Sequence, residues 1–350
     1  MAILQAADIG DLVVSTQKDL GRMKFNSIAN RVQRYHGFRN LMRKERVMMY
    51  DGTESQQTLM VDHNNSARMT ALFATDVVNR VDVLKTISVP YRHMTGNYSY
   101  DLHELKMNRG KSEIVNLVKT QRAAAMISIA EKCESQFWAA PSSSTDTSNT
   151  WGVPYWLVYN ATTGFNGGHP TGFTDVAGLS ATTYTRWKNF SGQFTNVTKA
   201  DLIRKMREGA TKCSFEQPTD IPEYSRGGAR IGYYTNYDNV SLMEELLEAQ
   251  NDNLGNDLAS KDSVTLFRRY PVVWVPQLDS GTPATADPVY GINWEYFKVI
   301  CLADWFLKET GPFRSSHQHN VQEVHIDLSF NLSCDNRRES FVIAKSDPTA

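Results

Sequence analysis

The sequence predicts an α+β fold organised around one long helix and one long strand. Residues 112–139 carry apolar side chains at helical spacing and include three alanines at 123–125, which favour helix. Residues 323–334 alternate between polar and apolar side chains, a pattern typical of a half-buried antiparallel strand. Because both segments are long, we expect them to pack as one elongated helix-on-sheet layer.

The predicted helix has recognisable ends. Ser112 is a candidate N-cap, and Pro141 stops the helix. At about 1.5 Å per residue the helix is roughly 40 Å long. Arg122 interrupts its apolar stripe. The stripe consists of Val115, Val118, Met126, Ile129, Cys133 and Phe137. Such a helix is either packed on the sheet of a globular enzyme or is a spine that braces a flat, extended subunit.

Composition is that of an ordinary folded protein. The 350 residues suffice for one large or two average domains, with 41% hydrophobic and 21% charged side chains. A formal net charge of −1 gives no general attraction to nucleic acid or anionic membranes. The first residues have no basic region, so we expect no signal peptide there, and no apolar run in the sequence is long enough to span a membrane. The four cysteines form no CxxC pair, so no zinc or redox motif is indicated, and lone thiols fit a reducing compartment.

Residues 15–46 form a basic arm. Only Asp19 and Glu45 oppose its cations, which indicates contact with phosphate or with an acidic neighbour, or else a solvated helical face. The cations are Lys18, Arg22, Lys24, Arg31, Arg34, Arg39, Arg43, Lys44 and Arg46. Residues 47–76 show no clear periodicity, and we predict no element there.

Residues 77–107 read as a two-stranded ribbon. Alternate apolar positions lead to Pro90, Gly96-Asn97 supplies a turn signal, and Tyr98 and Tyr100 alternate on the return. A ribbon of two strands is marginally stable alone. We therefore expect it to lie on the long helix or on a neighbouring molecule.

Residues 141–150 form a polar low-complexity loop and the clearest boundary in the chain. A mixed region follows to about residue 290. It has amphipathic helices predicted at 198–212 and 240–251 and a strand-like stretch at 264–275. Loops are predicted at 164–172 and 281–288.

The last sixty residues contain the second strong feature. After the alternating strand, residues 335–338 are predicted to make a charged turn, and residues 341–344 return as a short strand. The spacing Gly311-x5-His317-x-His319-x3-Glu323 resembles the first half of a cupin metal motif, with His325 as a possible fourth ligand. The closing glycine is replaced by Phe330. A metal-dependent cupin-like enzyme using His317, His319 and Glu323 is therefore an alternative.

A second chemical hypothesis is a covalent link between subunits. The amine of Lys85 or Lys106 could attack the side-chain amide of Asn331 or Asn336 if a desolvated carboxylate took the proton. No P-loop, GxGxxG or G-x-S-x-G motif occurs in the sequence.

The order of these parts resembles the tailed-bacteriophage major capsid proteins of the Hong Kong 97 fold. On this resemblance, residues 1–46 are the N-terminal arm, 47–108 the extended loop region and 109–140 the spine helix of the peripheral domain. Residues 141–290 are the axial domain, and 291–350 contribute the C-terminal strands of the peripheral domain.

The resemblance implies a protein without catalytic activity or cofactor. It would self-assemble into pentamers and hexamers of an icosahedral head, first as a procapsid, around double-stranded DNA. The implied location is the virion capsid, assembled in the host cytoplasm, with no membrane partner. The predicted inter-subunit contacts are Lys85, Arg92, Glu104, Arg109, Arg337 and Arg338.

Further partners follow from the same resemblance. No long helical region precedes the arm, so we expect a separate scaffolding protein or a segment cleaved earlier. A portal and a decoration protein are further expected partners. A different self-assembling virion component, such as a tail or sheath protein, is the remaining alternative.

Overall fold

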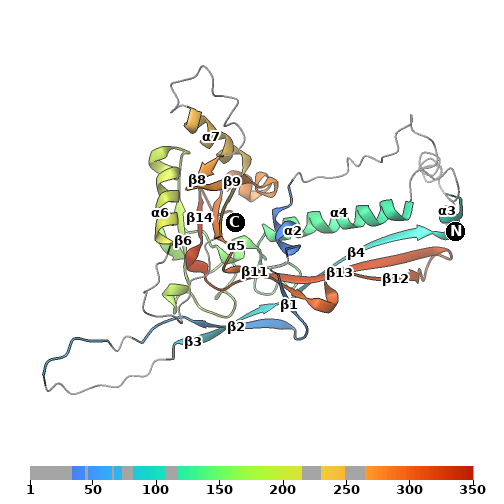
Figure 1. Ribbon diagram of the computed structural model, residues 1–350, viewed down its shortest axis with the longest axis horizontal. Coiled ribbons are helices and arrows are strands. Elements are labelled where there is room, and N and C mark those ends of the chain that lie inside the picture. The colour runs from blue at the N-terminus through green and yellow to red at the C-terminus, as the bar shows by residue number, and fades with distance from the viewer. Residues whose placement is uncertain are drawn as a thin grey trace.

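In the computed structural model, the described residues form two β-sheets, a two-stranded ribbon and one long helix (Figure 1). Figure 1 shows the long helix and one sheet extending together away from the second sheet and its covering helices. In the part of the chain that the structure describes, no helix is long and apolar enough to cross a membrane. The structure describes residues 34–43, 46–64, 67–72, 82–107, 117–214, 230–248 and 265–349.

The first sheet has five strands and is centred on the longest strand, β13 (Val321–Cys334). The others are β1 (Val47–Met49), β4 (Arg92–Asp101), β11 (Phe297–Leu302) and β12 (Lys308–Arg314). β4 and β12 both pair with residues 322–327 of β13, so they lie on its opposite edges. β11 pairs with residues 330–334, and β1 pairs parallel with β11. The predicted long strand is confirmed.

Helix α4 (Leu117–Phe137) packs on β4 and confirms the predicted long helix. Its 21 residues span about 31 Å at about 1.5 Å per residue. Ile129, Cys133 and Phe137 of the apolar stripe are buried. The predicted N-cap, Ser112, lies outside the described residues.

Arg122, which interrupts the stripe, is exposed on α4. Its Nε donates to the carboxylate of Glu309 on β12 at 2.8 Å. This ion pair joins the helix to the edge of the sheet, which explains why a charge is tolerated in an otherwise apolar row.

The predicted hairpin turn at Gly96-Asn97 is wrong. β4 continues straight through both residues, which pair with consecutive residues of β13. Gly96 serves close packing instead, because a Cβ there would lie 2.8 Å from the Cδ1 of Ile129 on α4. A glycine that admits a crossing helix has the same sequence signature as a turn glycine.

The projecting ribbon is formed by β2 (Glu54–Met60) and β3 (Leu84–Pro90), paired antiparallel along their whole length. The alternation of the sequence predicted β3 but missed β2, whose exposed positions are mostly polar. Figure 1 shows this ribbon leaving the body of the molecule on the side away from α4.

The second sheet has seven strands. In spatial order these are β5 (Gly164–Gly167), β6 (Asn189–Gln193), β14 (Phe341–Ala344), β10 (Val289–Asn293), β7 (Ile231–Thr235), β9 (Tyr270–Trp274) and β8 (Leu266–Phe267). The predicted strand at 341–344 is confirmed, but it joins this sheet and not the sheet of β13. The stretch predicted as strand at 264–275 is the β8–β9 hairpin, with a turn at Arg268-Arg269.

Helices cover one face of the seven-stranded sheet. They are α6 (Arg204–Lys212), which continues a π-helical turn at Lys199–Ile203, and α7 (Tyr237–Glu248). Both confirm predicted helices. Their side chains share an apolar cluster with the sheet that includes Met206, Met243 and Phe341.

The opposite face shares a core with the five-stranded sheet. Phe137 and Trp138 at the end of α4, Tyr290 of β10 and Leu332 of β13 belong to this one continuous cluster. The two sheets are therefore joined by a common hydrophobic interior, which requires them to fold together.

The remaining elements are short. They are α2 (His36–Leu41), α3 (Leu102–Met107), α5 (Val153–Trp156), α8 (Thr282–Ala286) and 3-10 turns at Thr185–Trp187, Pro276–Asp279, Ala303–Trp305 and Arg337–Glu339. The loop predicted at 281–288 was wrong in part, because α8 occupies most of it. Pro283 in its first turn is compatible with a helix start.

Candidate assembly surfaces

The β2–β3 ribbon exposes apolar side chains at one of its ends. Met60 and Leu84 lie directly opposite one another across the ribbon and are 49% and 55% exposed. At its base, Val89 and Ile87 are buried, and the Ser88 amide donates to the Ala177 carbonyl at 3.1 Å. The ribbon is thus anchored at one end and presents apolar side chains to solvent at the other, which indicates burial against another molecule.

Two predicted contact residues have partners within the subunit. The amine of Lys85 lies 2.6 Å from the carboxylate of Asp82, and this hydrogen bond raises the pKa of Lys85. Arg92 donates from Nη2 to the Asp146 carbonyl at 3.0 Å and is half-buried, which lowers its pKa. Arg92 therefore ties β4 to the polar loop at 141–150.

That loop is ordered by its own aspartate. The carboxylate of Asp146 accepts hydrogen bonds from the Asn149 side chain and from the amides of Ser148 and Asn149, which lower its pKa to about 2. Two further residues were predicted to contact another subunit. Glu104 lies half-buried on α3, and Arg109 lies outside the described residues.

The prediction that Arg337 contacts another subunit is wrong. Its side chain is fully buried between the two sheets and donates to three backbone carbonyls and one amide oxygen. The acceptors are Trp156 O at 2.6 Å, Trp187 O at 3.0 Å, Gly168 O at 3.1 Å and Asn189 Oδ1 at 3.0 Å. Burial lowers the pKa of Arg337 to about 10, so the guanidinium remains charged at neutral pH. Because Arg337 stands in a run of charged residues, the sequence analysis placed it on the surface, whereas the structure makes it an internal hydrogen-bond donor.

Arg338, its neighbour, faces a cavity of about 660 Å³ beside the Met60 end of strand β2. Its guanidinium lies 4.3 Å from the centre of the Phe165 ring, and burial lowers its pKa. Across the cavity, Arg186 Nε lies 3.7 Å from the carboxylate of Asp62. These charges lie beside the exposed Met60–Leu84 pair of the ribbon, so Arg338 remains a candidate contact residue.

The predicted metal ligands do not converge. His319 accepts a hydrogen bond from Arg314 Nη2 at Nδ1, at 2.6 Å, and this guanidinium would repel a cation. Glu323 lies on β13 opposite Phe313 of β12. Across the described ranges, no three histidine, cysteine, aspartate or glutamate side chains are grouped closely enough to hold a metal ion. The cupin-like site is thus not formed by His317, His319 and Glu323.

The asparagines proposed for a covalent link have structural roles. The buried Asn331 side chain accepts from the Trp151 amide at 2.9 Å and donates to the Pro90 carbonyl at 2.7 Å. Asn336 caps the turn that carries Arg337 by accepting from the Arg338 amide at 3.1 Å. Among the described residues, no hydrogen bond joins either side-chain amide to a lysine amine.

Glu134, which the sequence reasoning missed, holds α2 against α4. Its buried carboxylate accepts from the amides of His36 at 3.0 Å, Gly37 at 2.6 Å and Phe38 at 3.0 Å, and from the Trp138 indole at 2.8 Å. Burial raises the pKa of Glu134, and the four donors oppose that shift. The sequence offered one signal for this role, since Glu134 directly follows Cys133 of the apolar stripe of the helix.

We expect Glu134→Gln to lower the free energy of unfolding by about 1–3 kcal/mol, because the amide NH₂ of glutamine would face N–H donors. Thermal unfolding of the purified subunit measures this loss. Glu245→Gln, at an exposed position of α7, is the matched control and should change the unfolding temperature little. Equal behaviour of the two variants would show that Glu134 does not hold α2.

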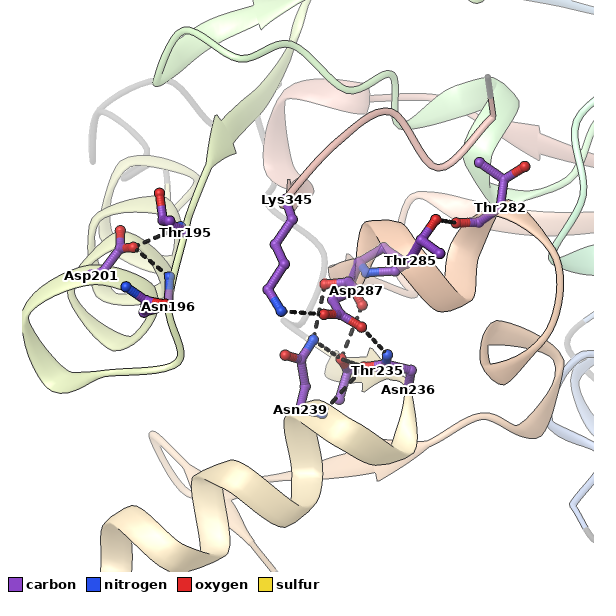
Figure 2. A network of polar contacts seen from close by, with 11 residues as sticks. Thr195, Asn196, Asp201, Thr235, Asn236, Asn239, Thr282, Thr285, Asp287 and Lys345 are labelled. Atoms are coloured by element: carbon purple, nitrogen blue, oxygen red, sulfur yellow. Dashed lines mark hydrogen bonds and ion pairs between the residues drawn. The ribbon is translucent and has the colours of Figure 1, made fainter.

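A second buried network, shown in Figure 2, ties the C-terminal segment to the seven-stranded sheet. The carboxylate of Asp287 accepts from the amine of Lys345, at 2.5 Å, and from the Asn236 amide. Asn239 donates to the Asp287 carbonyl and to the hydroxyl of Thr235, both at 2.9 Å. Asp287 adopts a left-handed backbone conformation with φ of 47°, and these bonds keep it there.

Comparisons with known proteins identify the fold. No protein-family model matches the chain, and no curated protein sequence matches it significantly. Among solved structures, the capsid asymmetric unit of cyanophage A-1(L) matches with a TM-score of 0.59 and 15% identity, over 93% of this chain and 96% of that one. The capsid of Myoviridae phage XM1 matches with a TM-score of 0.54 and 10% identity, over 99% of each chain.

The capsid of a native GTA particle matches with a TM-score of 0.56 and 10% identity, over 98% of this chain and 99% of that one. Because these likenesses extend over nearly the whole of both chains, they confirm the predicted α+β fold of the Hong Kong 97 capsid type. At such low identity they establish the architecture only.

Proposed function

We propose that this chain is the major capsid protein of a tailed bacteriophage, which assembles into pentamers and hexamers of an icosahedral head enclosing double-stranded DNA. The observation that carries the proposal is an end-to-end likeness to capsid subunits in a molecule whose ribbon projects with exposed apolar residues. Heterologous contacts between identical chains close into rings when the rotation permits. Such contacts commonly bury about 2,000–5,000 Å².

The parts of the fold take the following roles in this proposal. The β2–β3 ribbon is the extended loop, α4 the spine helix, the seven-stranded sheet the axial domain and the five-stranded sheet the peripheral domain. The sheet pairing supports moving one predicted boundary, because β14 pairs with β6 and β10 and so belongs with the axial part. Residues 1–46 are the N-terminal arm in this proposal, and α2 belongs to its described part.

The proposed role is structural and includes no catalysis. The subunits would assemble as a procapsid in the host cytoplasm and remain in the virion. The likeness to capsid subunits supports other copies of this chain as its principal partner. A separate scaffolding protein, a portal and a decoration protein belong to the same proposal.

Electron microscopy of the purified protein under assembly conditions tests the proposal. Closed shells support it. Tubes would favour a tail or sheath component, and a protein that stays a compact monomer under every assembly condition would overturn it. Intact-mass analysis of the same particles tests whether chains become covalently joined.

The ribbon supplies a sharper test. We expect the double substitution Met60→Asp and Leu84→Asp to prevent shell formation while the subunit still folds, because it places charge on the exposed apolar pair. Thr58→Asp with Thr86→Asp is the matched control, since these exposed residues form the next cross-strand pair on the same face. Normal shells from the first variant would show that this apolar pair is not buried on assembly. Circular dichroism verifies folding of both.

A further inference from the structure

Strand β4 (Arg92–Asp101) is a long outer strand of the five-stranded sheet. It pairs with β13 over all ten of its residues and lies on the side of β13 away from β12 (Figure 1). Among the described residues, its main chain forms no hydrogen bond outside the ladder with β13. Because successive residues of a strand point their N–H and C=O groups to alternate sides, every second residue of β4 directs an unpaired donor and acceptor outward.

Helix α4 packs on one face of β4 through side chains. The sulfur of Met94 lies 3.9 Å from the thiol of Cys133. On the same face, a Cβ at Gly96 would lie 2.8 Å from the Cδ1 of Ile129. The opposite face of β4 is open to solvent, and its exposed residues are His93, Thr95, Asn97 and Ser99.

The other outer strands of the two described sheets are short or interrupted. β1, β5 and β8 have three, four and two residues. The register of β12 shifts between Thr310 and Phe313, and Pro312 in that interval lacks an amide donor. β4 has no proline, and no lysine, arginine, aspartate or glutamate lies between its terminal residues. Native sheets protect their edges with short strands, prolines or charges, so a long edge without them marks a place where another strand adds.

We propose that the free edge of β4 pairs antiparallel with β4 of a second copy of this chain, which joins two five-stranded sheets into one. This inference rests on the proposed capsid function, and it names the surface through which neighbouring rings meet. Rings that join at their edges into a closed shell meet across two-fold axes, where both copies present the same surface. An antiparallel pair of identical strands has this two-fold symmetry.

The open face of β4 is self-complementary about Asn97. When Asn97 lies opposite its own copy in an antiparallel pair, Thr95 lies opposite Ser99 of the other copy. In the same register His93 lies opposite Asp101. Hydroxyl side chains that face one another and a histidine that faces a carboxylate are favourable cross-strand pairs, and no two like charges are opposed.

The side chains at the two ends of this register have capacity for a further partner. The Nδ1 of His93 lies 2.6 Å from the hydroxyl of Ser329, which leaves the second ring nitrogen for the other copy. The carboxylate of Asp101 accepts a hydrogen bond from the His103 amide at 2.7 Å and has lone pairs for another donor. The titratable residues that β13 places beside β4 on this face lie one strand further from the second copy, and they are Glu323, His325 and Asp327.

Single cysteines test this register, because all four native cysteines are buried. Asn97→Cys places a thiol opposite its own copy, at a Cα separation of about 4.5–5.5 Å that a disulfide spans. Thr95→Cys is the matched control, since Thr95 is exposed on the same face of the same strand. In the proposed register its own copy lies four residues, or about 13 Å, along the partner strand, which a disulfide cannot span.

Particles of each variant are assembled in reductant, then oxidised and run on a denaturing gel without reductant. We expect most Asn97→Cys chains to run at twice the single-chain mass and Thr95→Cys chains to run at the single-chain mass. Thr95→Cys combined with Ser99→Cys should restore the dimer, because these two positions face one another across the pair. The double variant gives the same test if Asn97→Cys does not form shells.

Single-chain mass for both Asn97→Cys and the double variant would overturn the inference, and this is also the result expected if an extended segment of another protein occupies the edge. An equal share of dimer from Thr95→Cys would overturn it as well. Electron microscopy scores shell formation separately. Shells whose Asn97→Cys chains stay single reject the β4 contact alone, whereas absence of shells from the unmodified protein rejects the capsid function.

Discussion

Arg337→Met is expected to lower the free energy of unfolding by about 3–5 kcal/mol, a large share of the about 5–15 kcal/mol by which folded proteins are stable. The guanidinium is buried and satisfies carbonyls at residues 156, 168 and 187 and the Asn189 side chain. Methionine fills the volume of the stem but donates no hydrogen bond, so each of these acceptors loses a partner in a site that water does not enter.

The position of Arg337 enlarges the effect. It lies in the turn between β13 and β14, where the chain passes from one sheet to the other, and its acceptors come from three separate segments around α5 and β6. Loss of the clamp therefore loosens the junction on which the shared core depends.

Thermal unfolding and soluble yield measure this loss. Arg204→Met, which removes an exposed arginine of α6, is the control and should change stability by less than about 0.5 kcal/mol. Arg337→Lys keeps the charge but has a single donor atom in place of a planar fork, so we expect it to lie between the two. An Arg337→Met protein as stable as the control would contradict the clamp.

Gly152→Ala is the second large expected effect, a destabilisation of about 3 kcal/mol or more, because the new methyl group would collide with backbone. An ideal Cβ at Gly152 would lie 2.6 Å from the Phe137 carbonyl oxygen and 2.7 Å from that of Gln136, and closer still to Ala139 O. No side-chain rotation relieves such a contact.

The carbonyls of Gln136 and Phe137 belong to the last turn of α4, and that of Ala139 follows the helix. The Thr150 hydroxyl donates to the Gln136 carbonyl at 3.1 Å, so the strand-like segment before α5 caps the helix by lying directly across its end. A displaced segment would lose this cap as well as the packing of Trp151.

Differential scanning calorimetry of the purified variant measures the loss. Gly178→Ala is the control, since a Cβ at Gly178 meets nothing within 4 Å although its φ is +83°. We expect the control to cost about 1 kcal/mol from backbone strain alone. Comparable losses in both variants would show that backbone collision is not what makes Gly152 necessary.

Much of the local structure was predictable from the sequence. α4, β13, α6 and α7 are long enough for their periodicity to identify both the element and its buried face, as Ile129 on α4 and Ile326 on β13 illustrate. The order of these elements was sufficient to predict the fold that the comparisons confirm.

The candidate site was predicted less well. β3 was expected to pair with β4, but it pairs with β2, which has no clear pattern of its own. Of the six predicted contact residues, Arg337 is internal and Lys85 and Arg92 have partners within the subunit. Charge in a sequence shows that a side chain needs polar partners, but not whether those partners are water, another subunit or the protein's own backbone.

The amino-acid sequence by itself determined which segments are helices and strands and which of their faces are apolar, because that information repeats every two or four residues. Only the tertiary structure decided which strands pair, that β14 crosses to the other sheet, and that Arg337 and Glu134 are buried. Those outcomes depend on hydrogen bonds between residues about a hundred or more positions apart, such as Arg337 with Trp156 and Glu134 with Gly37, and no local pattern encodes them.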